Sequence, residues 1–290
     1  MNERTASAIL GVSTDIWIRD MQHDTHRTAR RLAELGGLFS TGAKQRRFFQ
    51  LAEELLKNRT SEYYALLRSL CREVDATALK TFGIAFGYYA LSHGAAKRRT
   101  AKKDGGADVS FASFQRGAQA VSLERTVCGG TPLGTTAYFV FPDAQADADA
   151  LASVMRAHKD CAFLLFDDYC AFRENQPLNV MRLVPYQGFL DSNKPKSGTL
   201  CGAYTPYDDK SLEEDLSETR LNTLSKAGCL FYVLIAKPGT SACTMTRAGN
   251  AVSQMRRKLP CPLFPVSLET DVAYVDAPAP QFLPQFAGIV

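Results

Sequence analysis

The segment from Gly134 to Asp168 restricts the fold of this chain more than any other. It reads GTTAYFVFPDAQADADALASVMRAHKDCAFLLFDD: an apolar run, an acidic Ala-rich amphipathic run and a second apolar run. This pattern predicts a strand at Thr136–Phe141, a helix at Ala146–His158 and a strand at Ala162–Phe166. Two strands joined through a helix run parallel in one sheet, so the segment predicts an α/β fold.

The rest of the second half continues the alternation of strands and helices. A helix is predicted before this segment at Phe111–Leu123, and others at Leu212–Ala227 and near Arg247–Leu259. The three further predicted strands are Met181–Tyr186, Cys229–Ala236 and Leu263–Leu268. About five parallel strands do not close an eight-stranded barrel, so an open sheet or a partial (β/α) barrel is expected.

The first hundred residues predict helices. The segments DTHRTARRLAELGGLFS, AKQRRFFQLAEELLKN and SEYYALLRSLCREV carry apolar residues at helical spacing. Asp75 is a plausible cap for a fourth helix, in which Gly83 and Gly87 lie one turn apart and predict close packing of another element. We therefore expect a helical N-terminal region at residues 1–103 and an α/β region at residues 104–290.

Charge is distributed unevenly between these two regions. Residues 1–103 hold 18 Lys and Arg against 10 Asp and Glu, and residues 104–290 hold 16 against 20. The basic half indicates an acidic partner, which is either nucleic acid or the other half of the chain. However, no aromatic residue is interleaved with the cations of KRRTAKKDGGAD, residues 97–108. A helix end followed by a solvated linker is therefore favoured over a nucleic-acid site.

Neither a membrane segment nor a metal centre is expected from the sequence. The longest charge-free apolar stretch of the helical half, Phe82–Leu91, is far shorter than the about 20 residues that span a bilayer. The first residues, MNERTASAIL, lack the layout of a signal peptide, so a cytoplasmic protein is expected. The eight cysteines are scattered singly, without the spacing of zinc or iron–sulfur loops.

Several segments together resemble a group of bacterial radical SAM proteins. TSEYYALLRSLCREVDATALKTFGIAFGYYALSHGA is similar to the helical lead-in of that family, and TTAYFVFPDAQADADALASVMRAHKDCAFLLFDD is similar to its second strand, helix and third strand. MRLVPYQGF resembles the fourth strand, and LNTLSKAGCLFYVLIA the next helix and strand. The resemblance runs from about residue 60 to 270. It implies a partial barrel, a 4Fe-4S cluster held by a CxxxCxxC loop after the first strand, and binding of S-adenosylmethionine.

The chain departs from that family where its chemistry resides. No cysteine lies between the linker and Phe111, and the first barrel strand itself is expected to be missing. Pro142, Asp143, Ala144 and Gln145 stand where the family has Gly-Gly-Glu-Pro, Gln187 stands where it often has an acid, and the cysteine-rich C-terminal extension is lacking. We therefore expect a non-catalytic radical SAM-like protein that binds a protein partner or a small ligand and needs no cofactor.

The sequence leaves two alternative functions open. One is a radical SAM enzyme whose 4Fe-4S cluster is built from distant cysteines and which binds S-adenosylmethionine. The other is a nucleic-acid binder that uses the basic N-terminal half. The motifs of serine hydrolases, P-loop proteins, zinc proteases and dinucleotide-binding folds do not occur, and none of the four histidines falls at a predicted strand end.

Carboxylates at the predicted strand ends are the candidate ligand site. Parallel strands would bring Asp143, Asp167, Asp168 and Glu269 to one mouth, with Lys237 nearby after the predicted strand Cys229–Ala236. Clustered carboxylates repel one another and gain from a positive charge between them, so such a lip suits a cation or an amine-bearing ligand. The alternative is that these acids simply solvate the loops.

Overall fold

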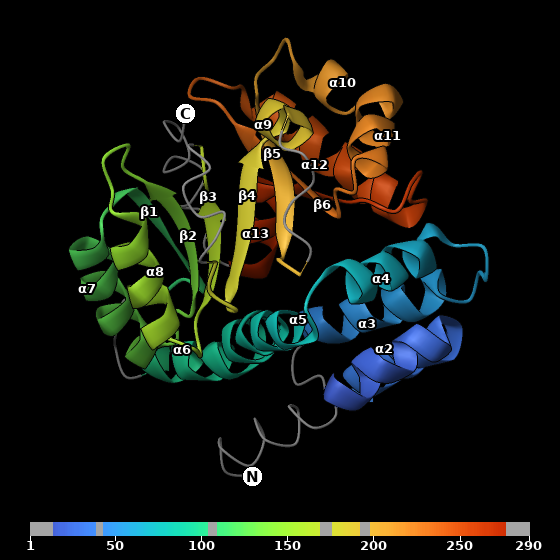
Figure 1. Ribbon diagram of the computed structural model, residues 1–290, viewed down its shortest axis with the longest axis horizontal. Helices are drawn as coiled ribbons and strands as arrows, with labels where there is room; N and C mark the ends of the chain where they lie inside the picture. Colours follow the sequence, from blue (N-terminus) through green and yellow to red (C-terminus); the bar gives the residue numbers. More distant parts are fainter. Residues whose placement is uncertain (1–13, 39–42, 104–108, 169–175, 192–197, 277–290) are drawn as a thin grey trace.

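The computed structural model describes residues 14–38, 43–103, 109–168, 176–191 and 198–276 of the chain. Within this part, seven strands form one parallel sheet whose spatial order is the order of the strands along the chain (Figure 1). The strands are β1 Ala112–Ala118, β2 Ala137–Pro142, β3 Ala162–Phe166, β4 Val180–Pro185, β5 Cys201–Tyr207, β6 Phe231–Ala236 and β7 Phe264–Ser267. The chain therefore adds each new strand beside the previous one.

Helices precede the sheet and connect its strands. Those before the sheet are a helix at residues 14–23, α2 Thr25–Leu38, α3 Ala43–Leu55, α4 Glu62–Glu73, α5 Ala76–Gly83, the π-helix η1 Ile84–His93 and α6 Gly94–Lys103. Those that follow are α7 Ala120–Gly130, the 3-10 turn η2 Thr131–Leu133, α8 Ala148–Ala157, α9 Tyr186–Asp191, α10 Leu212–Asp215, α11 Glu218–Lys226, α12 Ala242–Arg257 and α13 Leu268–Asp276. In Figure 1 the connecting helices α7 to α12 surround the sheet, and α5 and α6 cross below it.

Alternating side chains of the strands enter two different cores, because successive residues of a strand point to opposite faces. On β2, Tyr138 and Val140 are fully buried against Leu151 and Met155 of α8. The neighbouring Phe139 belongs instead to the core on the other face, which includes Phe82 of α5. Both faces of the sheet are thus covered, which explains why its strands are nearly continuous apolar runs.

A row of alanines lets the N-terminal helices approach the sheet. Ala112, Ala137 and Ala162 begin β1, β2 and β3 and are paired directly with one another across the sheet. They share one buried cluster with Ala85 and Ala90 of η1, which contacts β2 and β3. Small side chains on the strands and on η1 leave room for this helix at the amino ends of the strands. The carboxyl ends of the strands lie at the opposite edge of the sheet.

Two strands were not predicted from the sequence. The helix predicted at Phe111–Leu123 is wrong for its first part, which forms β1, and so the first strand is present rather than missing. The strand β5, CGAYTPY, was overlooked because Gly and Pro argue against a strand. Gly202 is required there, since an added Cβ would lie 2.6 Å from the Phe231 carbonyl oxygen. The sheet therefore has seven strands rather than about five.

In the helical half, the structure describes the site of the predicted glycine contact and most of the cationic segment at residues 97–108. Gly83 and Gly87 do not mark a close helix contact, because a Cβ added at either meets no atom within 4 Å. The cationic segment continues as helix to Lys103, and residues 104–108 of the predicted linker lie outside the described residues. In this helix Arg98 donates to the carbonyl oxygens of Gly134 (2.6 Å) and Ala90 (3.3 Å), so it fixes α6 against the chain before β2.

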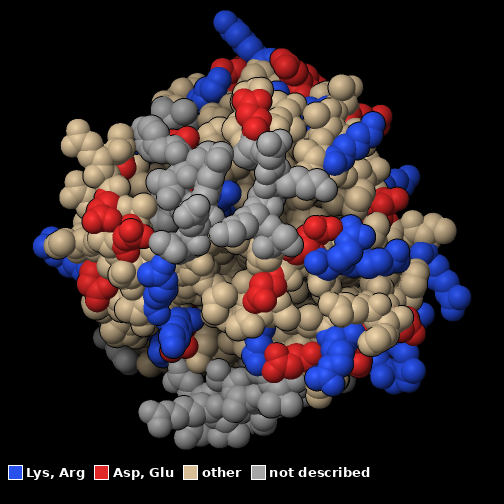
Figure 2. Space-filling view, in the orientation of Figure 1, with Lys and Arg blue, Asp and Glu red and all other residues tan. Residues whose placement is uncertain are grey.

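The surface view adds no sign of a nucleic-acid groove. On the face shown in Figure 2, Lys and Arg side chains are interspersed with Asp and Glu, without a continuous basic stripe over the described residues. Across the described ranges, every helix is too short or too polar to cross a bilayer.

Candidate functional site

The carboxyl edge of the sheet is where a ligand site is expected in an open parallel α/β fold. Asp143 follows β2 there, but its carboxylate serves the local turn. Its Oδ1 accepts from the Gln145 amide at 2.9 Å, and its own amide donates to the Ala118 carbonyl at 3.2 Å. This residue therefore shapes the loop beside the end of β1.

The two aspartates after β3 have different partners. Asp167 is buried and lies 3.5 Å from a guanidinium nitrogen of Arg182, a buried arginine of β4. Asp168 remains exposed and accepts a hydrogen bond from the Tyr204 hydroxyl. Partial desolvation, together with the charge of Asp167, raises the pKa of Asp168. Arg182 was missed as a site residue, although a lone cation inside the apolar run MRLVP was a visible signal.

Lys237 and Glu269 do not join these aspartates in a shared ion-pair network. The Lys237 ammonium lies 3.0 Å from Asp208 Oδ2, and this bond, with hydrogen bonds from the backbone amides of Lys210 and Ser211, lowers the pKa of Asp208 to about 2. Glu269 is fully buried, and its Oε1 accepts from the Ala236 amide at 2.6 Å. Burial raises the pKa of Glu269 to about 7. The predicted acidic lip is thus divided among separate pairs, and its binding of an amine or a cation stays a prediction.

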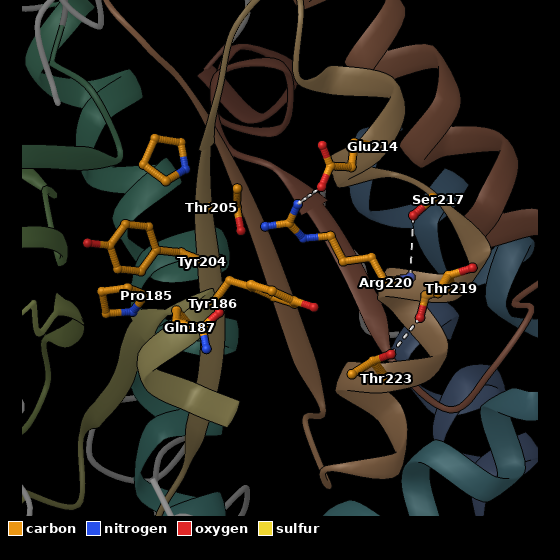
Figure 3. Close-up of a pocket in the computed structure, with 11 residues that line it drawn as sticks. Pro185, Tyr186, Gln187, Tyr204, Thr205, Glu214, Ser217, Thr219, Arg220 and Thr223 are labelled. Carbon is orange, nitrogen blue, oxygen red and sulfur yellow. Dashed lines mark hydrogen bonds and ion pairs between the residues drawn. The ribbon is translucent and has the colours of Figure 1, made fainter. Parts of the chain in front are cut away.

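An open pocket of about 710 Å³ lies at the same edge, at the ends of β4 and β5 (Figure 3). Its walls come from the start of α9, from β5 and from the α10–α11 segment. The lining side chains are mainly hydroxyl-bearing, with one amide and one ion pair; they include Tyr186, Tyr204, Thr205, Ser217, Arg220 and Thr223. Of the lining residues, only Gln187 was singled out from the sequence, as a departure from the family, while Tyr204 and Thr205 lie on β5, which was not predicted.

Arg220 occupies the centre of this pocket. Its guanidinium lies 3.9 Å from the centroid of the Tyr186 ring and 2.6 Å from Asp215 Oδ1, with Glu214 farther away at 3.8 Å. Figure 3 shows the guanidinium reaching across the pocket between Tyr186 and Glu214. Burial raises the pKa of Asp215, although the Arg220 charge opposes the shift. The ring and the carboxylates hold the arginine in place and balance its charge.

Two buried polar atoms in the pocket wall make no hydrogen bond: Thr205 Oγ1 and Arg220 Nε. Thr205 is 6% exposed. The nearby Tyr232 hydroxyl gives its own proton to the Asp215 carbonyl oxygen at 3.2 Å. Thr205 lies close enough to lower the pKa of Tyr232 against the larger effect of burial, but the two hydroxyls do not meet hydrogen-bond geometry. Leaving a buried polar group unsatisfied costs about 1–3 kcal/mol, so a ligand or a water molecule that reached either atom would gain a hydrogen bond.

The connection after the first strand is too short for an iron–sulfur loop. Strand β1 ends at Ala118 and α7 begins at Ala120, so Gln119 alone joins them. Of the described cysteines, Cys201, Cys229 and Cys261 share one buried cluster, where each thiol contacts a backbone carbonyl. Burial raises the pKa of all three thiols, which disfavours the thiolates that a cluster needs.

Comparisons with known proteins do not identify the chain. No family model, no curated protein and no solved structure matches it.

Proposed function

We propose that this chain is a non-catalytic protein with radical SAM-like architecture that binds a small polar ligand in the pocket at the ends of β4 and β5. The order of the strands supports a partial barrel, since neighbours along the chain are also neighbours in the sheet, as in the wall of a (β/α) barrel. The first strand that such a barrel needs is β1.

The unsatisfied atoms Thr205 Oγ1 and Arg220 Nε carry this proposal. A buried hydroxyl inside a strand gains a partner only when something enters the pocket beside it. The surrounding Ser217, Thr223 and Tyr186 offer further hydroxyl groups that donate and accept. Because the charge of Arg220 is already balanced by Asp215, a neutral ligand rich in hydroxyl or amide groups fits this pocket better than a strongly charged one.

Thr205→Val tests whether the threonine is adapted to a ligand rather than to stability. The change keeps the shape and removes the unsatisfied hydroxyl, so the ligand-free protein should become more stable by about 1 kcal/mol in urea unfolding. Thr135→Val is the matched control. Its buried hydroxyl donates to the Ser110 carbonyl at 2.7 Å, so this variant should lose about 1 kcal/mol.

The same pair of variants identifies ligands. A thermal-shift screen with small polyols, sugars and amides should find compounds that stabilise the wild type and the Thr135→Val variant but act weakly on Thr205→Val. If every stabilising compound acts equally on Thr205→Val, the pocket is not the binding site and the proposal is wrong.

Radical chemistry is not part of the proposed function. The one-residue connection between β1 and α7 leaves no room for a CxxxCxxC loop. The purified protein should be colourless and free of iron, and calorimetric titration with S-adenosylmethionine should show no binding tighter than about millimolar, or about 4 kcal/mol.

The alternative enzyme has a specific test in the same experiment. Anaerobic reconstitution that yields a stoichiometric 4Fe-4S spectrum, lost on substitution of Cys201, Cys229 or Cys261, would restore the reading in which distant cysteines assemble the cluster.

A further inference from the structure

A second group of chemically reactive side chains lies away from the pocket, on the connecting helices of β1 to β3. Glu124 and Cys128 come from α7, and His158 ends α8. One donor atom from each lies within 4.8 Å of the others. We propose that these three residues bind a divalent metal ion of the zinc class, with one coordination position left open.

The helical spacing and the packing of the two helices bring the group together. Glu124 and Cys128 are four residues apart and therefore occupy the same face of α7. Leu123 and Val127, beside them, are fully buried against Leu151 and Met155 of α8. Both elements are thus fixed by packing, as a precise metal site requires.

Buried hydrogen bonds fix the turn that carries His158. Asn179 is 2% exposed, and its side-chain nitrogen lies within hydrogen-bond distance of three backbone carbonyl oxygens, which share its two protons: those of Met155 (2.8 Å), His158 (3.0 Å) and Cys161 (2.9 Å). The Cys161 amide also donates to the His158 carbonyl at 3.0 Å. The backbone of His158 is therefore held independently of its imidazole, whose Nε2 faces Glu124.

The two measured distances between donor atoms are close to those around a tetrahedral ion, and all three donor atoms lie within 4.8 Å of one another. His158 Nε2 lies 3.0 Å from Glu124 Oε2, and Cys128 Sγ lies 3.4 Å from Glu124 Oε1. Zinc bonds of 2.0–2.3 Å in a tetrahedron separate neighbouring ligands by about 3.3–3.8 Å. Binding would therefore replace these hydrogen bonds with metal bonds after only small side-chain movements, and the Cys128 proton would be released.

The chemistry of the donors selects the metal. A thiolate, an imidazole and a carboxylate together suit Zn²⁺ or Co²⁺, whereas Mg²⁺ and Ca²⁺ prefer oxygen ligands alone. Cys128 is exposed, and the side chains of His158 and Glu124 are 21% and 46% exposed. An ion can thus enter from solvent, and water would complete its coordination.

Cobalt titration of the full-length protein, without an added histidine tag, tests the site. Co²⁺ should produce a sulfur-to-metal absorption band in the near ultraviolet, and Zn²⁺ should displace it at one equivalent. Cys128→Ser should abolish the band, while His158→Asn and Glu124→Gln should each weaken metal binding at least tenfold. Cys243→Ser is the matched control, because Cys243 is also an exposed thiol but lies on α12.

Circular dichroism of each variant shows whether the fold is intact. If Cys128→Ser fails to fold, His158→Asn and Glu124→Gln still test the site. The proposal is overturned if no band forms and Zn²⁺ binds no tighter than millimolar. It is equally overturned if the band persists in Cys128→Ser or disappears in Cys243→Ser.

Discussion

A fragment of residues 104–290 is expected to aggregate or unfold when it is produced alone. The N-terminal helices and the sheet share one buried cluster, in which Phe82, Ala85 and Ala90 lie with the alanines that begin β1 to β3. Removal of the helices would expose this apolar face of the sheet, where η1 contacts β2 and β3 and α5 contacts β4. Size-exclusion chromatography and urea unfolding of the fragment should show aggregates or no cooperative transition.

A single substitution in the full-length chain measures the same contact. Phe82 is 8% exposed and stacks on Phe86 with ring centroids 5.8 Å apart. Phe82→Ala should lower the free energy of unfolding by about 3–5 kcal/mol. Val121→Ala, at a side chain that is 73% exposed, should change it by less than about 0.5 kcal/mol. A soluble, monomeric fragment with a cooperative transition would instead show that the helical half is a separate module.

The sequence sufficed for the strands with simple apolar patterns. The strand predicted at Ala162–Phe166 has the observed bounds of β3, and the one predicted at Met181–Tyr186 differs from β4 by one residue at each end. In contrast, Phe111 and Phe114 are three residues apart, a spacing that favours a helix. However, Phe111 directly precedes β1 and Phe114 lies within it. Pairing with β2 outweighs this local preference.

The candidate sites were harder to predict, because each depends on which elements become neighbours. The carboxylates at the strand ends could be found by pattern, but the pairing of Asp167 with Arg182 and of Lys237 with Asp208 is a property of the assembled sheet. The metal-binding group was overlooked for a local reason. The predicted helix ended at Leu123, whereas α7 continues to Gly130 and so places Glu124 and Cys128 on one face.

The buried carboxyl group of Glu269 should make the protein less stable as the pH rises. Burial raises its pKa in the folded state to about 7, from 4.5. The proton is therefore held more tightly in the folded state than in the unfolded state. The resulting contribution to the free energy of unfolding is fully present below about pH 4.5 and is lost as the pH rises through 7. The loss amounts to about 3 kcal/mol at alkaline pH.

Glu269→Gln should remove this dependence and stabilise the protein above pH 8 by about 3 kcal/mol. The amide oxygen of glutamine can still accept from the Ala236 amide, as Oε1 of Glu269 does at 2.6 Å. Its NH₂ group would replace Oε2, which makes no hydrogen bond, and could donate to the hydroxyl of Tyr207. That hydroxyl is close enough for the Glu269 charge to add to the effect of burial in raising the pKa of Tyr207.

Urea unfolding of both proteins between pH 5 and pH 9 measures the difference. Glu54→Gln, at an exposed glutamate of α3, is the matched control and should follow the wild type at every pH. If Glu269→Gln is less stable than the wild type above pH 8, the folded protein must stabilise the negative charge of the Glu269 carboxylate, and the prediction is wrong. A stabilised variant instead means that this position retains an acid at a cost to folding, as is common for groups whose buried charge is used in function.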